Sequence, residues 1–213
     1  MTRHAGTLPT SYFDELYAAD PDPWQFETSE YERGKYAATL AALPQERYSS
    51  ALEVGCSIGV LTRQLAGRCD VLVSLDIAEG ALDRARARCQ DLAHVDFRLK
   101  QVPNDWPEGR FDLIVLSEVV YYLDAGDVER LVERVRGALA VGGDVVLVHW
   151  TGETHYPLTG DTAAERFIDR ASAFLRVHGQ ARTDKYRLDV LVGCEGYAPC
   201  KLTLPHPGHE RAS

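Results

Sequence analysis

Short apolar runs alternate with amphipathic stretches through the central part of the chain. The apolar runs predict strands at 50–54, 71–75, 95–99, 111–116 and 143–149, and the amphipathic stretches predict helices at 59–67, 79–92 and 126–140. Strands and helices that alternate in this way form a parallel sheet with right-handed crossovers. After a helix near 161–173, residues 174–182 and 186–192 predict an antiparallel hairpin that closes the sheet.

Two helical segments precede this pattern. Residues 11–17 predict the first, and the turn-rich stretch Asp20-Pro21-Asp22-Pro23-Trp24 ends it. Ser29 is placed to cap a second helix, with Glu32 at the capping-box position and Pro44 at the end. We therefore expect residues 1–45 to form an N-terminal helical lid.

The loop after the first predicted strand carries the strongest chemical signal. The sequence Glu53-Val54-Gly55-Cys56-Ser57-Ile58-Gly59 joins an apolar run to a helical pattern. Glycine lets the backbone approach a ligand, and the helix N-terminus presents free N–H groups. Asp76 ends the second strand 21 residues after Gly55, where a carboxylate grips a ribose diol. These features are typical of a nucleotide-binding α/β unit.

The pattern of glycines argues against two common nucleotide classes. A dinucleotide fingerprint would need glycine at the positions of Ser57 and Val60, and a P-loop would need a G-K-[ST] ending. Glu53 at the mouth of the loop would repel a pyrophosphate and suits a cationic ligand. A Rossmann-like domain for another nucleotide is the alternative.

These residues resemble the class I S-adenosylmethionine-dependent methyltransferases. The resemblance implies a Rossmann-like α/β fold: a seven-stranded, mostly parallel sheet with one antiparallel strand and helices on both faces. It also implies S-adenosylmethionine as cofactor, with Asp76 on the ribose hydroxyls. The remaining loop and strand-end residues expected at the cofactor are Gly55, Cys56, Gly59, Ile77 and Ser117.

Composition limits the class of protein. The chain has 213 residues, of which 45% are hydrophobic, and we expect a single domain over 1–213 with a cofactor-binding core at 50–150. A net charge of −9 disfavours nucleic acid as a partner. No run approaches the roughly 20 apolar residues of a membrane span, and no apolar signal core opens the chain, so we expect a cytoplasmic protein without membrane attachment.

The cysteines and histidines near the C-terminus predict no metal site. The five cysteines lack framework spacing, so reduced thiols are expected. Cys194, Cys200, His206 and His209 lack the close C-x-x-C pair of structural zinc motifs, so residues 194–213 are interpreted as a frayed tail.

The end of the fourth predicted strand is a second candidate site. Ligands of open α/β sheets bind beyond the carboxyl ends of the strands, which places residues 117–122 at the mouth. Glu118 and Tyr121 can frame a small polar substrate, and Glu118 would position a cationic amine. Packing in the lid is the alternative for Tyr121 and Tyr122.

Three strings resemble the nodulation protein S family: Asp22-Pro23-Trp24, Tyr31-Glu32-Arg33-Gly34-Lys35-Tyr36 and Glu118-Val119-Val120-Tyr121-Tyr122-Leu123. Members are S-adenosylmethionine-dependent methyltransferases, and the founding activity is N-methylation of the free amino sugar of a deacetylated chitooligosaccharide. The resemblance implies that Trp24 covers the cofactor and Arg33 pairs with its carboxylate; a surface salt bridge with Glu30 or Glu32 is the alternative for Arg33. Gln101 and the Val102 backbone are expected at the adenine.

Residues 151–193 follow the fifth strand and are expected to form the substrate loop and the closing hairpin. His149 and His155 lie near the expected reacting centre, where a histidine can accept a proton from a hydroxyl or ammonium group. A structural role is the alternative for each. We expect a sugar-containing small-molecule acceptor, methylated on an amine or, alternatively, on a hydroxyl, and either a monomer or a homodimer.

Overall fold

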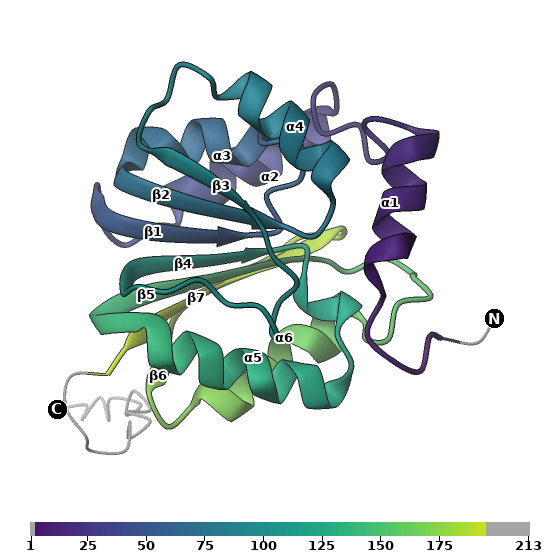
Figure 1. The fold of residues 1–213 in the computed structure, drawn as a ribbon. Coiled ribbons are helices and arrows are strands. Elements are labelled where there is room, and N and C mark those ends of the chain that lie inside the picture. Colours follow the sequence, from purple (N-terminus) through teal and green to yellow (C-terminus); the bar gives the residue numbers. More distant parts are fainter. Residues whose placement is uncertain (1–2, 195–213) are drawn as a thin grey trace, which may run out of the picture.

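The computed structural model describes residues 3–194. Its centre is a seven-stranded sheet in the order β3-β2-β1-β4-β5-β7-β6 (Figure 1). The strands are β1 (Tyr48–Val54), β2 (Cys69–Asp76), β3 (Val95–Leu99), β4 (Phe111–Ser117), β5 (Leu139–Trp150), β6 (Leu175–Arg182) and β7 (Tyr186–Gly193). Only the pairings made by β7 are antiparallel, which confirms the predicted sheet with one antiparallel strand.

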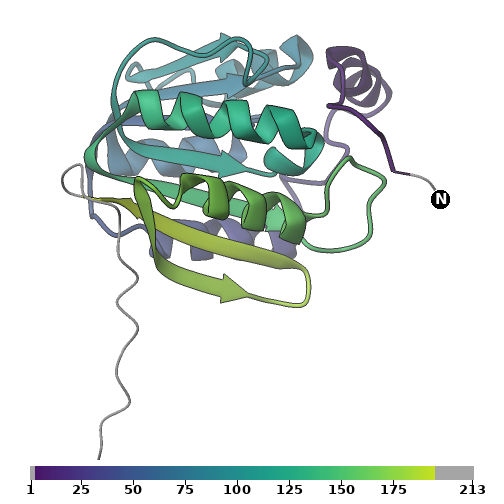
Figure 2. The ribbon, with the colours of Figure 1, turned by 90° about the horizontal axis from the view of Figure 1, so that it is seen from below.

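Helices cover both faces of the sheet. They are α1 (Thr10–Ala19), α2 (Glu30–Ala41), α3 (Val60–Leu65), α4 (Glu79–Arg88), α5 (Ala125–Ala138) and α6 (Gly160–Ala171). In Figure 1, α2, α3 and α4 lie on one face and α5 and α6 on the other, and Figure 2 shows α5 and α6 side by side. The first helix, α1, stands beyond the ends to which the parallel strands point.

The alternation of apolar side chains along the central strands explains the two layers of core. In β4, Leu113 and Val115 pack with residues of α2 and α3, whereas Ile114 and Leu116 pack with residues of α5 and α6. Successive side chains of a strand point to opposite faces, so a strand that is apolar throughout is buried on both sides. The sheet is therefore the middle layer of three.

The two largest departures from the predicted element boundaries are of four residues each. Helix α5 ends at Ala138 and β5 begins at once at Leu139, four residues before the predicted start. The extra residues form an irregular start to the strand, where the pairing register shifts and Gly142 has a φ of 71°. Helix α4 ends at Arg88 instead of residue 92, because Leu92 N turns back to Cys89 O.

Three sequence expectations concern caps, thiols and membranes. Ser29 caps α2, accepting a hydrogen bond from Glu32 N at 3.4 Å, as predicted. Cys56, Cys69 and Cys89 are buried free thiols as expected, whereas Cys194 is disulfide-bonded, which corrects the expectation of a reduced thiol there. Within residues 3–194 no helix has the length and apolar character needed to cross a bilayer, and no cluster of three metal-ligating side chains is present. Cys200, His206 and His209 lie outside the described residues.

Candidate functional site

A cavity of about 470 Å³ lies at the carboxyl ends of the central strands. Its wall includes Gly55, Asp76 and Ile77 from the ends of β1 and β2, and Ser117, Glu118 and Tyr121 from the end of β4. Gln101 and Val102 after β3 and Trp24 before α2 complete the predicted residues on the wall. The nine predicted wall residues thus come from five segments. Eight of them meet because parallel strands end at the same edge of a sheet, and Trp24 comes from the segment before α2.

The loop after β1 depends on glycine where two backbones meet. Gly55 has a φ of 84°, and a Cβ there would lie 2.2 Å from Val119 Cγ2 and 2.7 Å from Ser117 O. Gly59 has a φ of 78°, and its Cβ would lie 2.9 Å from the Ala85 backbone of α4. Gly55 therefore lets the β1 and β4 loops touch at the cavity, whereas Gly59 packs behind the wall.

Asp76 holds this loop in place. Its carboxylate accepts hydrogen bonds from Ser57 N at 2.8 Å and Ala78 N at 3.0 Å. Ser57 adopts a φ of 49°, which is uncommon for a residue with a side chain. Burial raises the pKa of Asp76, and the backbone donors oppose that rise. The carboxylate thus reaches the cavity from a rigid frame, with lone pairs left for a ligand's hydroxyl groups.

Glu53 does not face a ligand, contrary to the expectation that it would meet a cationic one. It is fully buried beneath the loop and accepts hydrogen bonds from Thr62 Oγ1 at 2.7 Å and Ser74 Oγ at 2.9 Å. Burial raises its pKa to about 7. Glu53 is the next-to-last residue of β1, a strand that lies between β2 and β4 in the sheet, and its side chain therefore points into the interior.

The expectation that Arg33 pairs with the cofactor carboxylate is also corrected. Arg33 lies on the exposed surface of α2, off the cavity wall. Its guanidinium lies 3.5 Å from Glu30 and donates to Thr28 O at 3.0 Å. The salt bridge that was the alternative for Arg33 is therefore what forms. Cys56 and Gly59 likewise lie outside the wall of the main cavity.

Aromatic side chains of the N-terminal segment close one side of the cavity. Phe13 and Tyr17 of α1 and Trp24 all line it. Tyr17 makes a 2.5 Å hydrogen bond between its hydroxyl and Ser57 Oγ, and its ring meets Trp24 edge to face at 5.8 Å. Phe13 packs against Tyr122 at 4.9 Å between centroids. The predicted lid thus exists, and Tyr17 is a wall residue that the sequence did not identify.

Glu118 is a wall residue whose carboxylate is held by three hydrogen bonds. It follows β4 with a φ of 55°, which is uncommon for a residue with a side chain. One carboxylate oxygen accepts from Lys35 Nζ at 2.5 Å; the other accepts from Tyr121 Oη at 2.6 Å and Trp150 N at 2.8 Å. Burial is the largest single influence and raises the Glu118 pKa, but the charge of Lys35 and the hydrogen bonds from Lys35 and Tyr121 act together against it, and the pKa is lowered overall.

Lys35 was missed as a site residue by sequence reasoning. It lies on the buried side of α2, is 2% exposed, and reaches across to Glu118 while also pairing with Glu32 Oε2 at 2.9 Å. Burial opposes its charge, yet the two carboxylates raise the Lys35 pKa overall. The Glu32–Lys35 spacing of three residues on a helix was a visible signal, but it is equally typical of a solvent-exposed pair.

The structure corrects the placement of both histidines. His149 is fully buried off the cavity wall, and its Nε2 accepts a hydrogen bond from Val120 N at 3.2 Å. Burial lowers its pKa to about 4, so the ring is neutral at neutral pH. His155 is exposed and also off the wall. His149 points to the interior because β5 is buried on both faces, which the apolar alternation alone did not reveal.

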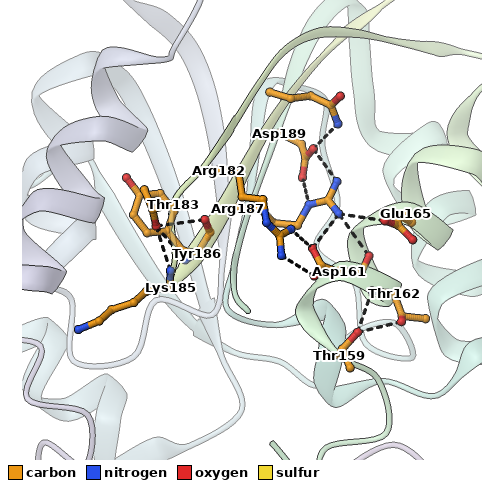
Figure 3. Close-up of polar contacts among 11 residues, drawn as sticks. Thr159, Asp161, Thr162, Glu165, Arg182, Thr183, Lys185, Tyr186, Arg187 and Asp189 are labelled. Carbon is orange, nitrogen blue, oxygen red and sulfur yellow. Dashed lines mark hydrogen bonds and ion pairs between the residues drawn. The ribbon is translucent and has the colours of Figure 1, made fainter. Parts of the chain in front are cut away.

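A polar cluster fixes the loop at 151–159, whose Glu153, Thr154 and Tyr156 line the cavity. Figure 3 shows Arg187 of β7 reaching towards the start of α6: it donates to both oxygens of Asp189 on the same strand at 2.9 Å and contacts Asp161 of α6 at 3.2 Å. Arg182 also binds Asp161. Because α6 is thereby held against the hairpin, the end of the loop is anchored.

The sequence is similar to those of known methyltransferases and of a nodulation protein family. The family Nodulation protein S (NodS) matches residues 13–147. The nodulation protein S of Rhizobium tropici is 39% identical over 131 residues, which are 61% of this chain and 55% of that protein. The chain thus spans a little over half the length of such relatives. Phosphoethanolamine N-methyltransferase 1 of Arabidopsis thaliana is 27% identical over 54% of this chain and 24% of its own.

Solved structures share the fold. A Pseudomonas syringae structure described as a candidate methyltransferase has 38% identity and a TM-score of 0.69, covering 77% of this chain and 99% of its own. The N-methyltransferase NodS of Bradyrhizobium japonicum WM9, in complex with S-adenosylhomocysteine, has 23% identity and a TM-score of 0.73, covering 87% and 99%. With a family match over more than half its length, this chain belongs to the nodulation protein S family.

Proposed function

We propose that this protein is an S-adenosylmethionine-dependent methyltransferase that methylates an amine of an amino sugar or another sugar-containing small molecule. The observation that carries the proposal is a single cavity whose wall contains the glycine loop after β1, Asp76 and the ion-paired Glu118. Family membership and the N-methyltransferase relatives support it. A cytoplasmic location is part of the same proposal.

The residues present fit S-adenosylmethionine. Asp76 would hold the ribose hydroxyls, and Gln101 with the Val102 backbone would face the adenine. Gly55 and Ser57 would face the methionine part, beneath Trp24 and Tyr17. Ile77 and Ser117 complete the wall beside them. When bound, the cofactor supplies a methyl group on a cationic sulfonium, a charge that suits a wall with more carboxylates than ammonium groups.

The protein's own part in the reaction is to align the acceptor and exclude water. Methyl transfer needs the nucleophile in line with the methyl group, and a closed cavity enforces that alignment. Glu118 would orient the acceptor amine, with Tyr121 fixing the carboxylate. An ammonium group must lose its proton before it can attack the methyl group. The protein therefore binds and orients the amine, and the neutral form is the nucleophile.

The position of the histidines favours an amine over a hydroxyl. A sugar hydroxyl needs a positioned base, whereas a neutral amine needs none. Among the described residues, no histidine lies on the cavity wall, and His149 Nε2 already accepts a hydrogen bond from Val120 N. Aromatic faces of Tyr31 and Trp150 beside Glu118 offer apolar surfaces on which a sugar ring can pack.

Calorimetric titration and product analysis test this function. We expect S-adenosylmethionine and S-adenosylhomocysteine to bind the wild type, and Asp76→Ala to weaken both by at least tenfold, since the ribose partner is lost. Mass spectrometry should detect methylation of glucosamine oligomers and none of their N-acetylated forms. Absence of cofactor binding by the wild type would overturn the proposed methyltransferase activity. Methylation of the N-acetylated forms would overturn the proposal that the acceptor group is an amine.

A further inference from the structure

Building on the proposed function, we infer that the acceptor end of the cavity selects by charge: it takes cationic amines, rejects amines that also carry a phosphate, and Glu153 sets this preference. The acceptor end is defined here as Glu32, Lys35, Glu118 and Glu153, the charged wall residues contributed by α2 and by the loops after β4 and β5. Three carboxylates against one ammonium leave a formal charge of −2.

The cations of the cavity wall are already engaged. Lys35 is buried between Glu32 and Glu118, with Nζ–O distances of 2.9 and 2.5 Å. Lys100 lies beside Gln101, towards the expected adenine site, and pairs with Asp105 at 2.7 Å. A phosphate would have to displace a carboxylate from one of these lysines, and it would do so inside a region that is already negative.

Cations near the acceptor end, but off its wall, are held elsewhere. Lys185 is not a wall residue, and its Nζ lies over the ring of Tyr31 at 5.2 Å from the centroid. Arg187 is committed to Asp161, Glu165 and Asp189, as Figure 3 shows. Arg3 donates to Tyr156 O at 3.0 Å. The arginine fork that usually recognises phosphate is therefore absent from the described wall.

Glu153 differs from the other carboxylates because its charge is free to act on a ligand. It lies on the loop after β5, is exposed, and contributes to the cavity wall. Among residues 3–194 it has no ion pair or side-chain hydrogen bond. An unpaired rim charge attracts a cationic ligand and repels an anionic one without any cost of breaking an existing pair.

The test compares glucosamine with glucosamine 6-phosphate, which share the amine and differ in charge. Calorimetry in the presence of S-adenosylhomocysteine measures binding, and initial rates with S-adenosylmethionine measure kcat/KM. For the wild type we expect at least a tenfold preference for glucosamine. Glu153→Gln should narrow this ratio, and Glu153→Lys should narrow it further, by about tenfold at low salt and less at high salt. Thermal unfolding checks that each variant folds.

Glu133→Lys is the matched control, because Glu133 is exposed on α5, lies off the cavity wall and produces the same change in net charge. Equal binding of the two sugars, binding of neither, or equal effects of Glu153→Lys and Glu133→Lys would overturn the inference. Preferential binding of glucosamine without methyl transfer would support the charge selection while overturning the proposed function. The two ideas can therefore fail separately.

Discussion

At the scale of single residues, the site is organised around Glu118. Its positive φ is a backbone conformation that costs free energy for a non-glycine residue, and such strain persists only where surrounding contacts enforce it. Lys35, Tyr121 and the Trp150 amide supply those contacts. The charge of Glu118 and the backbone shape of the β4 loop thus depend on one buried lysine from the helical lid.

Replacing Lys35 should be costly for this reason. Lys35→Met leaves Glu32 and Glu118 side by side without a cation, and removal of one partner of a buried ion pair costs about 3–5 kcal/mol. We expect that loss in the free energy of unfolding measured in urea. Lys35→Met combined with Glu32→Gln should recover part of it, since one unpaired carboxylate is removed. A loss below about 1 kcal/mol in the single variant would contradict this account.

At the scale of elements, strand ends and the loops after them build the cavity. The loop after β1 touches the loop after β4 through Gly55, and Asp76 at the end of β2 fixes the same loop through the Ser57 amide. The loop after β5 is anchored by the contacts of Arg187 and Arg182 with Asp161. Each loop is therefore positioned by an element distant in sequence.

The single substitution Gly55→Ala should abolish cofactor binding. A Cβ at 2.7 Å from Ser117 O and 2.2 Å from Val119 Cγ2 forces the β1 and β4 loops apart, and the φ of 84° is strained for alanine. Gly137→Ala in α5 is the control, because a Cβ there meets nothing within 4 Å and alanine favours a helix. Titration with S-adenosylhomocysteine compares them; equal affinities would refute the packing argument.

At the scale of the whole molecule, the buried ionisable groups determine how stability varies with pH. His149 is neutral and fully buried, and its pKa falls from 6.5 to about 4. The unfolded chain therefore binds a proton between these values that the folded protein does not, and stability is lost as pH falls through that window. Glu53 acts in the opposite direction, because its pKa is raised from 4.5 to about 7. Its contribution to the stability of the protein is lost as the pH rises from the pKa of the unfolded chain through that of the folded protein.

The His149 contribution can be isolated with His149→Gln, whose amide oxygen can still accept from Val120 N. Between pH 6.5 and pH 4 the wild type should lose up to about 3 kcal/mol of unfolding free energy relative to the variant. Glu53 is common to both proteins and cancels. Denaturant titrations across this range measure the shift, and a difference independent of pH would show that His149 is not buried neutral.

The local sequence determined the strands, the lid helices and the eight predicted wall residues that lie at or just after strand ends. Alternation of apolar positions fixes which face of a strand is buried, and parallel strands bring their ends together, so Gly55, Asp76 and Glu118 follow from pattern alone. The start of β5 was predicted four residues too late. Leu139 and Ala140 were assigned to the preceding helix, and the first residues of the strand join the sheet through a register shift.

Only the tertiary structure decided whether the polar side chains point to the interior or to the surface. Lys35 and Arg33 lie two residues apart on one helix, yet the first turns inward to Glu118 and the second outward to Glu30, because only one face of α2 packs on the sheet. His149 and Glu53 point into the interior for a similar reason. A charge inside a protein depends on partners distant in sequence, which spacing along the chain does not encode.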